Sequence, residues 1–62
     1  MAAKIRETTY GNHIHMVMKL NGRIEEVDNY CGLDNTWNHF QTTGDADETR
    51  RAEIINAFKE LY

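Results

Sequence analysis

An Asn21-Gly22 pair that follows eight alternating residues constrains this fold more than any other feature of the sequence. In residues 13–20, every second side chain is apolar, which is the period of a half-buried strand. Asn-Gly favours a tight reversal because these residues tolerate the positive φ that the turn requires. The sequence therefore predicts a β-hairpin with one apolar face, formed by Ile14, Met16, Met18 and Leu20.

Two registers of this hairpin remain open. A two-residue loop pairs Leu20 with Arg23 and places Ile24 on the face of His13, His15 and Lys19. A three-residue loop, with Gly22 in the left-handed position, pairs Met18 with Ile24 and keeps the apolar face together. Burial favours the longer loop and dipeptide preference the shorter, and a slip of one residue reverses the facing of the second strand.

The flanking segments supply further strands. Residues 4–10 contain β-branched and aromatic residues and end at a Gly11-Asn12 turn signal. Residues 23–31 also fit a helical period, but the preceding turn favours a strand. Residues 33–43 fit either a short helix capped by Asp34 or Asn35, or a fourth strand in residues 36–43.

The last segment predicts a helix. Asp45 is the expected N-cap, with Glu48 three residues later as its partner in a capping box. An apolar stripe follows, which would cover the apolar face of the hairpin. We expect one α+β domain over residues 1–62, with an antiparallel sheet of three strands, or four, and one C-terminal amphipathic helix packed across it in the order β-β-β-α. The stripe contains Ile54, Ile55, Phe58, Leu61 and Tyr62.

Size and composition set the expected setting. A chain of 62 residues buries only about 60% of its unfolded surface, so its core is marginal. Cys31 is the single cysteine, which excludes an internal disulfide and fits a reducing compartment. No apolar run approaches the roughly 20 residues of a membrane span. A cytoplasmic protein without a membrane partner is expected.

Charge is distributed unevenly along the chain. Residues 24–49 contain seven carboxylates and no Lys or Arg. Such a segment is typical either of a solvated face or of a surface that docks on a basic partner. Asp45, Asp47 and Glu48 already belong to the expected helix start. The predicted partner-binding residues are therefore Glu25, Glu26, Asp28 and Asp34, with Tyr30 and Trp37 as aromatic anchors.

The histidines raise a metal hypothesis. His13 and His15 leave the same face of a strand, and Cys31 and His39 would complete a tetrahedral zinc set. However, either hairpin register brings Asp28, Val27 or Tyr30 near the two histidines rather than Cys31. The spacing also matches no zinc-finger pattern. The prediction is therefore that the chain has no metal site and no cofactor.

Two other classes are disfavoured. Cys31, His39 and Asp34 would suit a nucleophilic centre, but a chain this short leaves little room for a pocket, so no enzyme activity is expected. Direct nucleic-acid binding would need a basic face, and the acidic half of the chain opposes it. The residues for such a face would be Lys4, Arg6, Lys19 and Arg23, with Tyr10 and Tyr30 for stacking.

The leading hypothesis is a small acidic protein-binding module. It would act as an inhibitor or regulator by occluding a surface, either basic or nucleic-acid-binding, of a larger protein. The alternatives are a homo-oligomeric structural or assembly protein, such as a homodimer, and a small His/Cys metal-binding domain. Compact chains of this kind are common among viral and mobile-element products, although no residue here demonstrates that origin.

Overall fold

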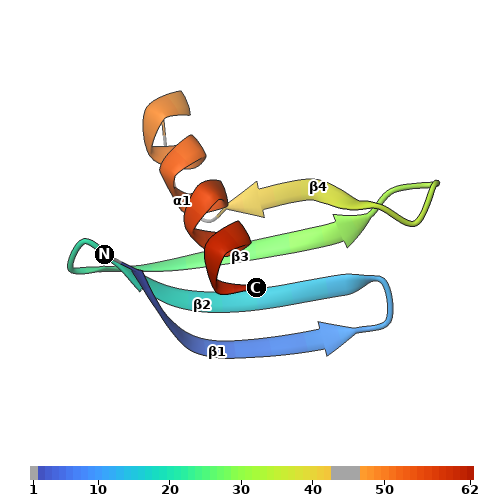
Figure 1. Cartoon of the computed structure of the whole chain (residues 1–62), viewed down its shortest axis with the longest axis horizontal. Helices are drawn as coiled ribbons and strands as arrows, with labels where there is room; N and C mark the ends of the chain where they lie inside the picture. The colour runs from blue at the N-terminus through green and yellow to red at the C-terminus, as the bar shows by residue number, and fades with distance from the viewer. Residues whose placement is uncertain (1, 43–46) are drawn as a thin grey trace.

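The fold is a four-stranded antiparallel sheet with one helix. A computed structural model describes residues 2–42 and 47–62, and the sheet order is β1-β2-β3-β4 (Figure 1). The predicted α+β class is confirmed, residues 23–31 form a strand rather than a helix, and a fourth strand is present. The elements are β1 (Ala2–Tyr10), β2 (His13–Leu20), β3 (Arg23–Cys31), β4 (Trp37–Thr42) and α1 (Glu48–Leu61).

The turn between β2 and β3 adopts the two-residue form. Asn21 and Gly22 have φ values of 52° and 83°, and Leu20 pairs with Arg23 across the turn. This pairing places Ile24 on the side of the sheet away from the helix, where 59% of its surface is exposed. The three-residue loop favoured by burial is therefore wrong. The conformational demand of the turn determines the register, and the apolar pattern of β3 does not.

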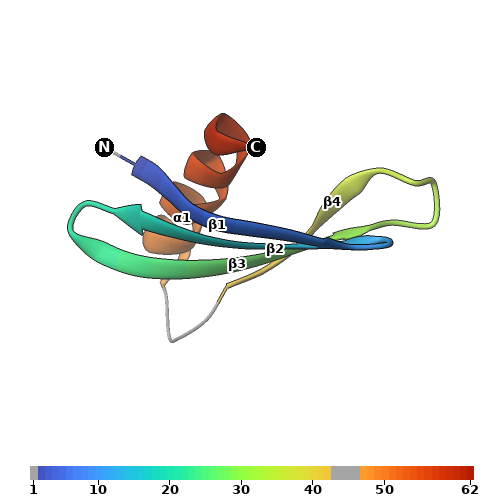
Figure 2. The ribbon, with the colours of Figure 1, turned by 90° about the horizontal axis from the view of Figure 1, so that it is seen from below.

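Helix α1 covers one face of the sheet, which we call the inner face. Figure 2 views the twisted sheet nearly edge-on and shows the C-terminal half of the helix on one side of it. Phe58 of the helix meets Phe40 of β4 edge to face, with ring centroids 5.5 Å apart. The predicted stripe contributes Ile54 and Phe58 to the core, but Tyr62 is exposed and Ala57 is buried in addition. The buried cluster comprises Ile14, Met16, Met18, Val27, Ile54, Ala57 and Phe58.

The helix begins later than the sequence predicts. Its N-cap is Asp47, whose Oδ1 accepts a hydrogen bond from the Arg50 backbone N–H at 2.8 Å. Glu48 is the first helical residue rather than the third residue after the cap. The expected cap Asp45 lies outside the described residues. Either aspartate can serve as a cap, and sequence spacing alone does not distinguish them.

A partly buried ion pair joins the helix to the sheet, with its carboxylate buried and 35% of its arginine side chain exposed. The two-residue turn directs Glu25 toward the inner face, where only 4% of its surface is exposed. Arg50 of α1 donates two hydrogen bonds to it, from Nη2 to Oε1 at 2.7 Å and from Nε to Oε2 at 3.1 Å. Such bidentate geometry is the strong form of this interaction. The pair satisfies a carboxylate that the register has placed against the core.

We expect the loss of Arg50 to destabilise the fold more than the loss of the Glu25 charge. Arg50→Met leaves a buried carboxylate without a partner, whereas Glu25→Gln leaves an arginine that can turn to solvent. Thermal unfolding should show a midpoint several degrees lower for Arg50→Met than for Glu25→Gln. The double variant should recover part of the loss.

Glu26→Gln is the matched control, because Glu26 lies on the same strand but faces away from the helix. Its unfolding midpoint should stay close to that of the wild type. Equal midpoints for Arg50→Met and this control would show that the buried pair contributes nothing to stability.

Candidate functional site

The side of the sheet opposite α1, which we call the open face, carries all three histidines of this chain. No described helix or strand covers it, as the edge-on view shows (Figure 2). Strand alternation sends the polar side chains of β2 to this face, because their neighbours Ile14, Met16 and Met18 point to the core. Its central rows contain Arg6, Thr8, Tyr10, His13, His15, Val17, Lys19, Ile24, Glu26, Asp28, Tyr30, His39 and Gln41.

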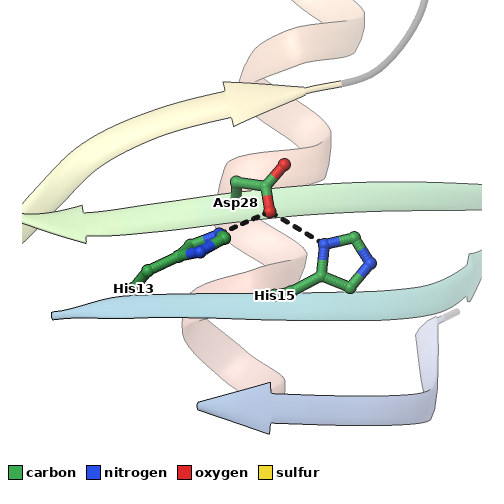
Figure 3. Close-up of side chains that lie close together, drawn as sticks. All are labelled: His13, His15 and Asp28. Carbon is green, nitrogen blue, oxygen red and sulfur yellow. Dashed lines mark hydrogen bonds and ion pairs between the residues drawn. The ribbon is translucent and has the colours of Figure 1, made fainter. Parts of the chain in front are cut away.

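Three of these residues converge on one point. His13 Nε2 lies 2.6 Å from Asp28 Oδ1, and His15 Nδ1 lies 2.8 Å from the same oxygen. Figure 3 shows both rings approaching the carboxylate from β2, with Asp28 projecting from β3 and the helix behind the sheet. Because an ionised carboxylate only accepts hydrogen bonds, each ring donates an N–H to it.

The register of the hairpin brings these three side chains together. His15 pairs directly with Asp28, and His13 pairs with Tyr30, one position further along the same face. The cluster is half-buried, since 22% to 24% of each side chain is exposed. His15 also lies 3.9 Å from Glu26, measured from Nε2 to Oε1. Two imidazoles and one carboxylate thus face solvent from the two central strands of the sheet.

The pKa of Asp28 reflects these neighbours. Partial burial is the largest single influence and would raise the pKa of this carboxyl. The hydrogen bonds and charges of His15 and His13 together outweigh it, so that the pKa lies below its ordinary value of 3.8. Asp28 is therefore ionised across the whole physiological range.

Aromatic rings hold His13 in place. Its ring stacks on Tyr30 with centroids 4.3 Å apart and planes 9° apart, and on Tyr10 at 5.4 Å and 28°. Tyr30 in turn meets His39 edge-on at 6.2 Å. These contacts run across all four strands and limit the rotation of the His13 ring.

The other end of the open face is apolar. Val17 is nearly buried, while 55% of Ile5 and 59% of Ile24 are exposed. With Arg6 they line a shallow hollow of about 480 Å³. The strand register shifts between Lys4 and Arg6, so Ile5 is an extra residue in a β-bulge, which re-aims side chains at a sheet edge. A second hollow of about 570 Å³ lies toward the cluster, lined by Arg6, Thr8, Tyr10, His13 and His15.

The structure separates the partner-binding residues predicted from the sequence. Glu26, Asp28 and Tyr30 share the open face, but Glu25 is buried on the inner face against Arg50. Alternation along β3 splits neighbouring carboxylates between the two faces, which is why the acidic segment does not form one continuous row.

The two remaining predicted residues lie elsewhere. Asp34 is exposed in the loop before β4, where its Oδ1 accepts the Thr36 backbone N–H at 3.0 Å. This bond lowers the pKa of the Asp34 carboxyl. Trp37 is half-buried and packs against the core cluster. Neither residue belongs to the open-face cluster.

The four sequence-predicted metal candidates also divide. His13 and His15 come together, whereas the ring of His39 meets Tyr30, and Cys31 Sγ lies 3.9 Å from the Asn35 carbonyl oxygen. Among residues 2–42 and 47–62, the His13, His15 and Asp28 ligand atoms form a group within 4.8 Å of one another. Sequence reasoning did not name Asp28 as a ligand, although the two-residue turn register would have found it.

Comparison of the chain with protein-family models, curated proteins and solved structures finds no match. Within the part of the chain that the structure describes, no helix has the length and apolar character to span a bilayer.

The Asp28 charge should contribute to stability in a pH-dependent way. Because its folded pKa lies below 3.8, ionised Asp28 favours the folded state above that pH, and the contribution disappears as the pH falls further. Asp28→Asn keeps an acceptor oxygen and removes the charge. With EDTA present, the gap between the unfolding midpoints of wild type and variant should shrink from about pH 5 to about pH 2. A gap that stays constant or widens over this range would contradict the assigned role of the charge.

Proposed function

We propose that this chain is a small protein-binding module that occupies the surface of a larger protein with its open face. The observation that carries the proposal is the exposed Ile5 and Ile24 pair above Val17, at the opposite end of the open face from the stacked Tyr10, His13 and Tyr30 rings. Apolar patches rimmed by polar side chains mark protein interaction sites. Aromatic and aliphatic anchors at such places carry most of the binding energy.

Charge on the open face indicates the chemistry of the partner. The cations Arg6 and Lys19 balance the carboxylates Glu26 and Asp28, and Asp28 is already occupied by two histidines. Glu26 is the more exposed carboxylate, with 44% of its side chain accessible and His15 only 3.9 Å away. The fitting partner therefore presents an apolar side chain to the hollow at Val17 and a basic group to Glu26.

The same charge count disfavours nucleic acid as the ligand. Of the basic residues suggested for such a role, Lys4 is paired with Glu7 at 3.2 Å. Phosphate binding depends on several uncompensated cations, which this face does not offer. Covering the surface of a larger protein would make the chain an inhibitor or regulator by occlusion.

Homo-oligomeric assembly is the second candidate. Strand β1 ends the sheet, so its outer edge pairs with no strand of residues 2–42. An uncovered edge can add a strand from another copy. The Ile5 bulge interrupts that edge, which favours the open face over the edge as the main contact.

A site-specific crosslinking experiment tests the proposal. A photo-reactive residue at position 24 should crosslink to one partner protein in a lysate of the source cells. The same residue at position 33 should not, although Leu33 is equally apolar and fully exposed in the loop. With the partner purified, Ile24→Glu should weaken binding at least about tenfold, which is about 1.4 kcal/mol, whereas Leu33→Glu should leave it unchanged.

Glu26→Gln should weaken binding less than Ile24→Glu and reduce its dependence on salt, because one charged contact is lost. If Leu33→Glu weakens partner binding as much as Ile24→Glu, or if Ile24→Glu leaves partner binding unchanged, the open-face assignment is contradicted. Crosslinks to a second copy alone, together with an unfolding midpoint that rises with protein concentration, would favour the homo-oligomer.

A further inference from the structure

We propose that His13, His15 and Asp28 form a binding site for one divalent transition-metal ion, of which Zn²⁺ is the representative. Two imidazole nitrogens and one carboxylate oxygen belong to the ligand types that zinc accepts, and three protein ligands leave one position open. The three atoms lie within 4.8 Å of one another on two adjacent strands. This site goes beyond partner binding, because it requires only the isolated chain.

The spacing of the side chains suits a single ion. Metal–ligand bonds of about 2.0 to 2.2 Å place the ligand atoms of a tetrahedral site roughly 3.4 Å apart. The present nitrogen–oxygen distances are 2.6 and 2.8 Å, and no pair exceeds 4.8 Å. Side-chain adjustments on the order of 1 Å would admit the ion without moving the strands. Both rings already direct a nitrogen at Asp28 Oδ1, the third ligand atom of the proposed site (Figure 3).

The metal would replace the two N–H groups that now bind Asp28. Each imidazole would then offer a lone pair from the nitrogen nearest the carboxylate and carry its proton on the other ring nitrogen. A neutral ring reaches this state by moving its single proton between the two nitrogens through solvent, whereas an imidazolium ring loses one proton to solvent. The carboxylate provides a negative ligand for the cation. No oxidant or reductant takes part in this exchange.

Neighbouring residues would orient two of the ligands. Metal-bound histidines commonly donate their other N–H to a carboxylate, and His15 Nε2 lies 3.9 Å from Glu26 Oε1. The His13 ring is held between Tyr10 and Tyr30. These contacts restrict the rings before an ion arrives, which reduces the ordering cost of binding.

The donor set selects among metals. Ca²⁺ and Mg²⁺ prefer sites made entirely of oxygen, and Cu⁺ prefers thiolate or thioether sulfur. Two nitrogens and one oxygen fit Zn²⁺, Co²⁺ and Ni²⁺. The open coordination position faces solvent, since the cluster lies on the uncovered side of the sheet.

The test is calorimetric titration of the EDTA-stripped, monomeric chain with ZnCl₂ after removal of the chelator, and a parallel titration with Co²⁺ followed by visible absorption. The wild type should bind one Zn²⁺ per chain and give the absorption of a four-coordinate cobalt site. Its unfolding midpoint should rise with Zn²⁺ concentration. His15→Asn and Asp28→Asn should each abolish the one-to-one isotherm, and Glu26→Gln should weaken it about tenfold.

Two matched controls separate this site from adventitious binding. His39→Asn removes a histidine on the same face, and Cys31→Ser removes the single thiol, so both should retain the wild-type affinity. His13→Gln should lose binding while circular dichroism and the metal-free unfolding transition show a folded chain. If His13→Gln does not fold, the cobalt spectrum of folded His15→Asn decides whether the ion binds at this cluster.

Absence of one-to-one binding by the wild type would overturn the proposal. Binding that survives His15→Asn but disappears with Cys31→Ser or His39→Asn would overturn it as well. Neither result bears on the crosslinks at position 24, so failure of the metal site and failure of the partner surface are distinguishable.

Discussion

The two-residue turn at Asn21-Gly22 is the constraint on which the rest of the structure depends. Both residues have positive φ, which is the conformation that matches the twist of the flanking strands. The turn fixes Leu20 opposite Arg23 and so fixes every later pair of β2 and β3. Since a shift of one residue would turn β3 over, this local geometry decides which side chains reach the helix and which stay on the open face.

The register costs stability on both faces of the sheet. On the open face it exposes Ile24, which forgoes up to about 2 kcal/mol of burial. On the inner face it turns the polar side chains of Glu25 and Asn29 toward the core. Arg50 satisfies Glu25 through two hydrogen bonds. Asn29 is only partly satisfied, because no hydrogen bond from the described residues reaches its Oδ1.

The apolar periodicity of the sequence predicts much of the fold, whereas the His13, His15 and Asp28 cluster depends on the register between β2 and β3. The alternation of residues 13–20 predicted β2, and the stripe at Ile54 and Phe58 predicted α1, because each pattern repeats over a whole element. The second face of β3 was not predictable in this way, since its apolar residues fit two registers and a helix. His13 and His15 could be placed on one face from their spacing. Asp28 joins them only through pairing across the hairpin, a long-range relation that one strand does not encode.

The acidic segment shows why a charge count in sequence does not translate into a charged surface. Alternation sends Glu25 inward to Arg50, Asp28 is shared by two histidines, and Asp34 and Asp47 accept backbone N–H groups. Each of these carboxylates has a local partner, which leaves Glu26 as the most available one on the open face. The proposed recognition of a partner by this face would therefore depend on apolar shape and on imidazole chemistry more than on net charge. A metal ion at the proposed site would make this almost neutral face locally positive, so that charge would then contribute to recognition as well.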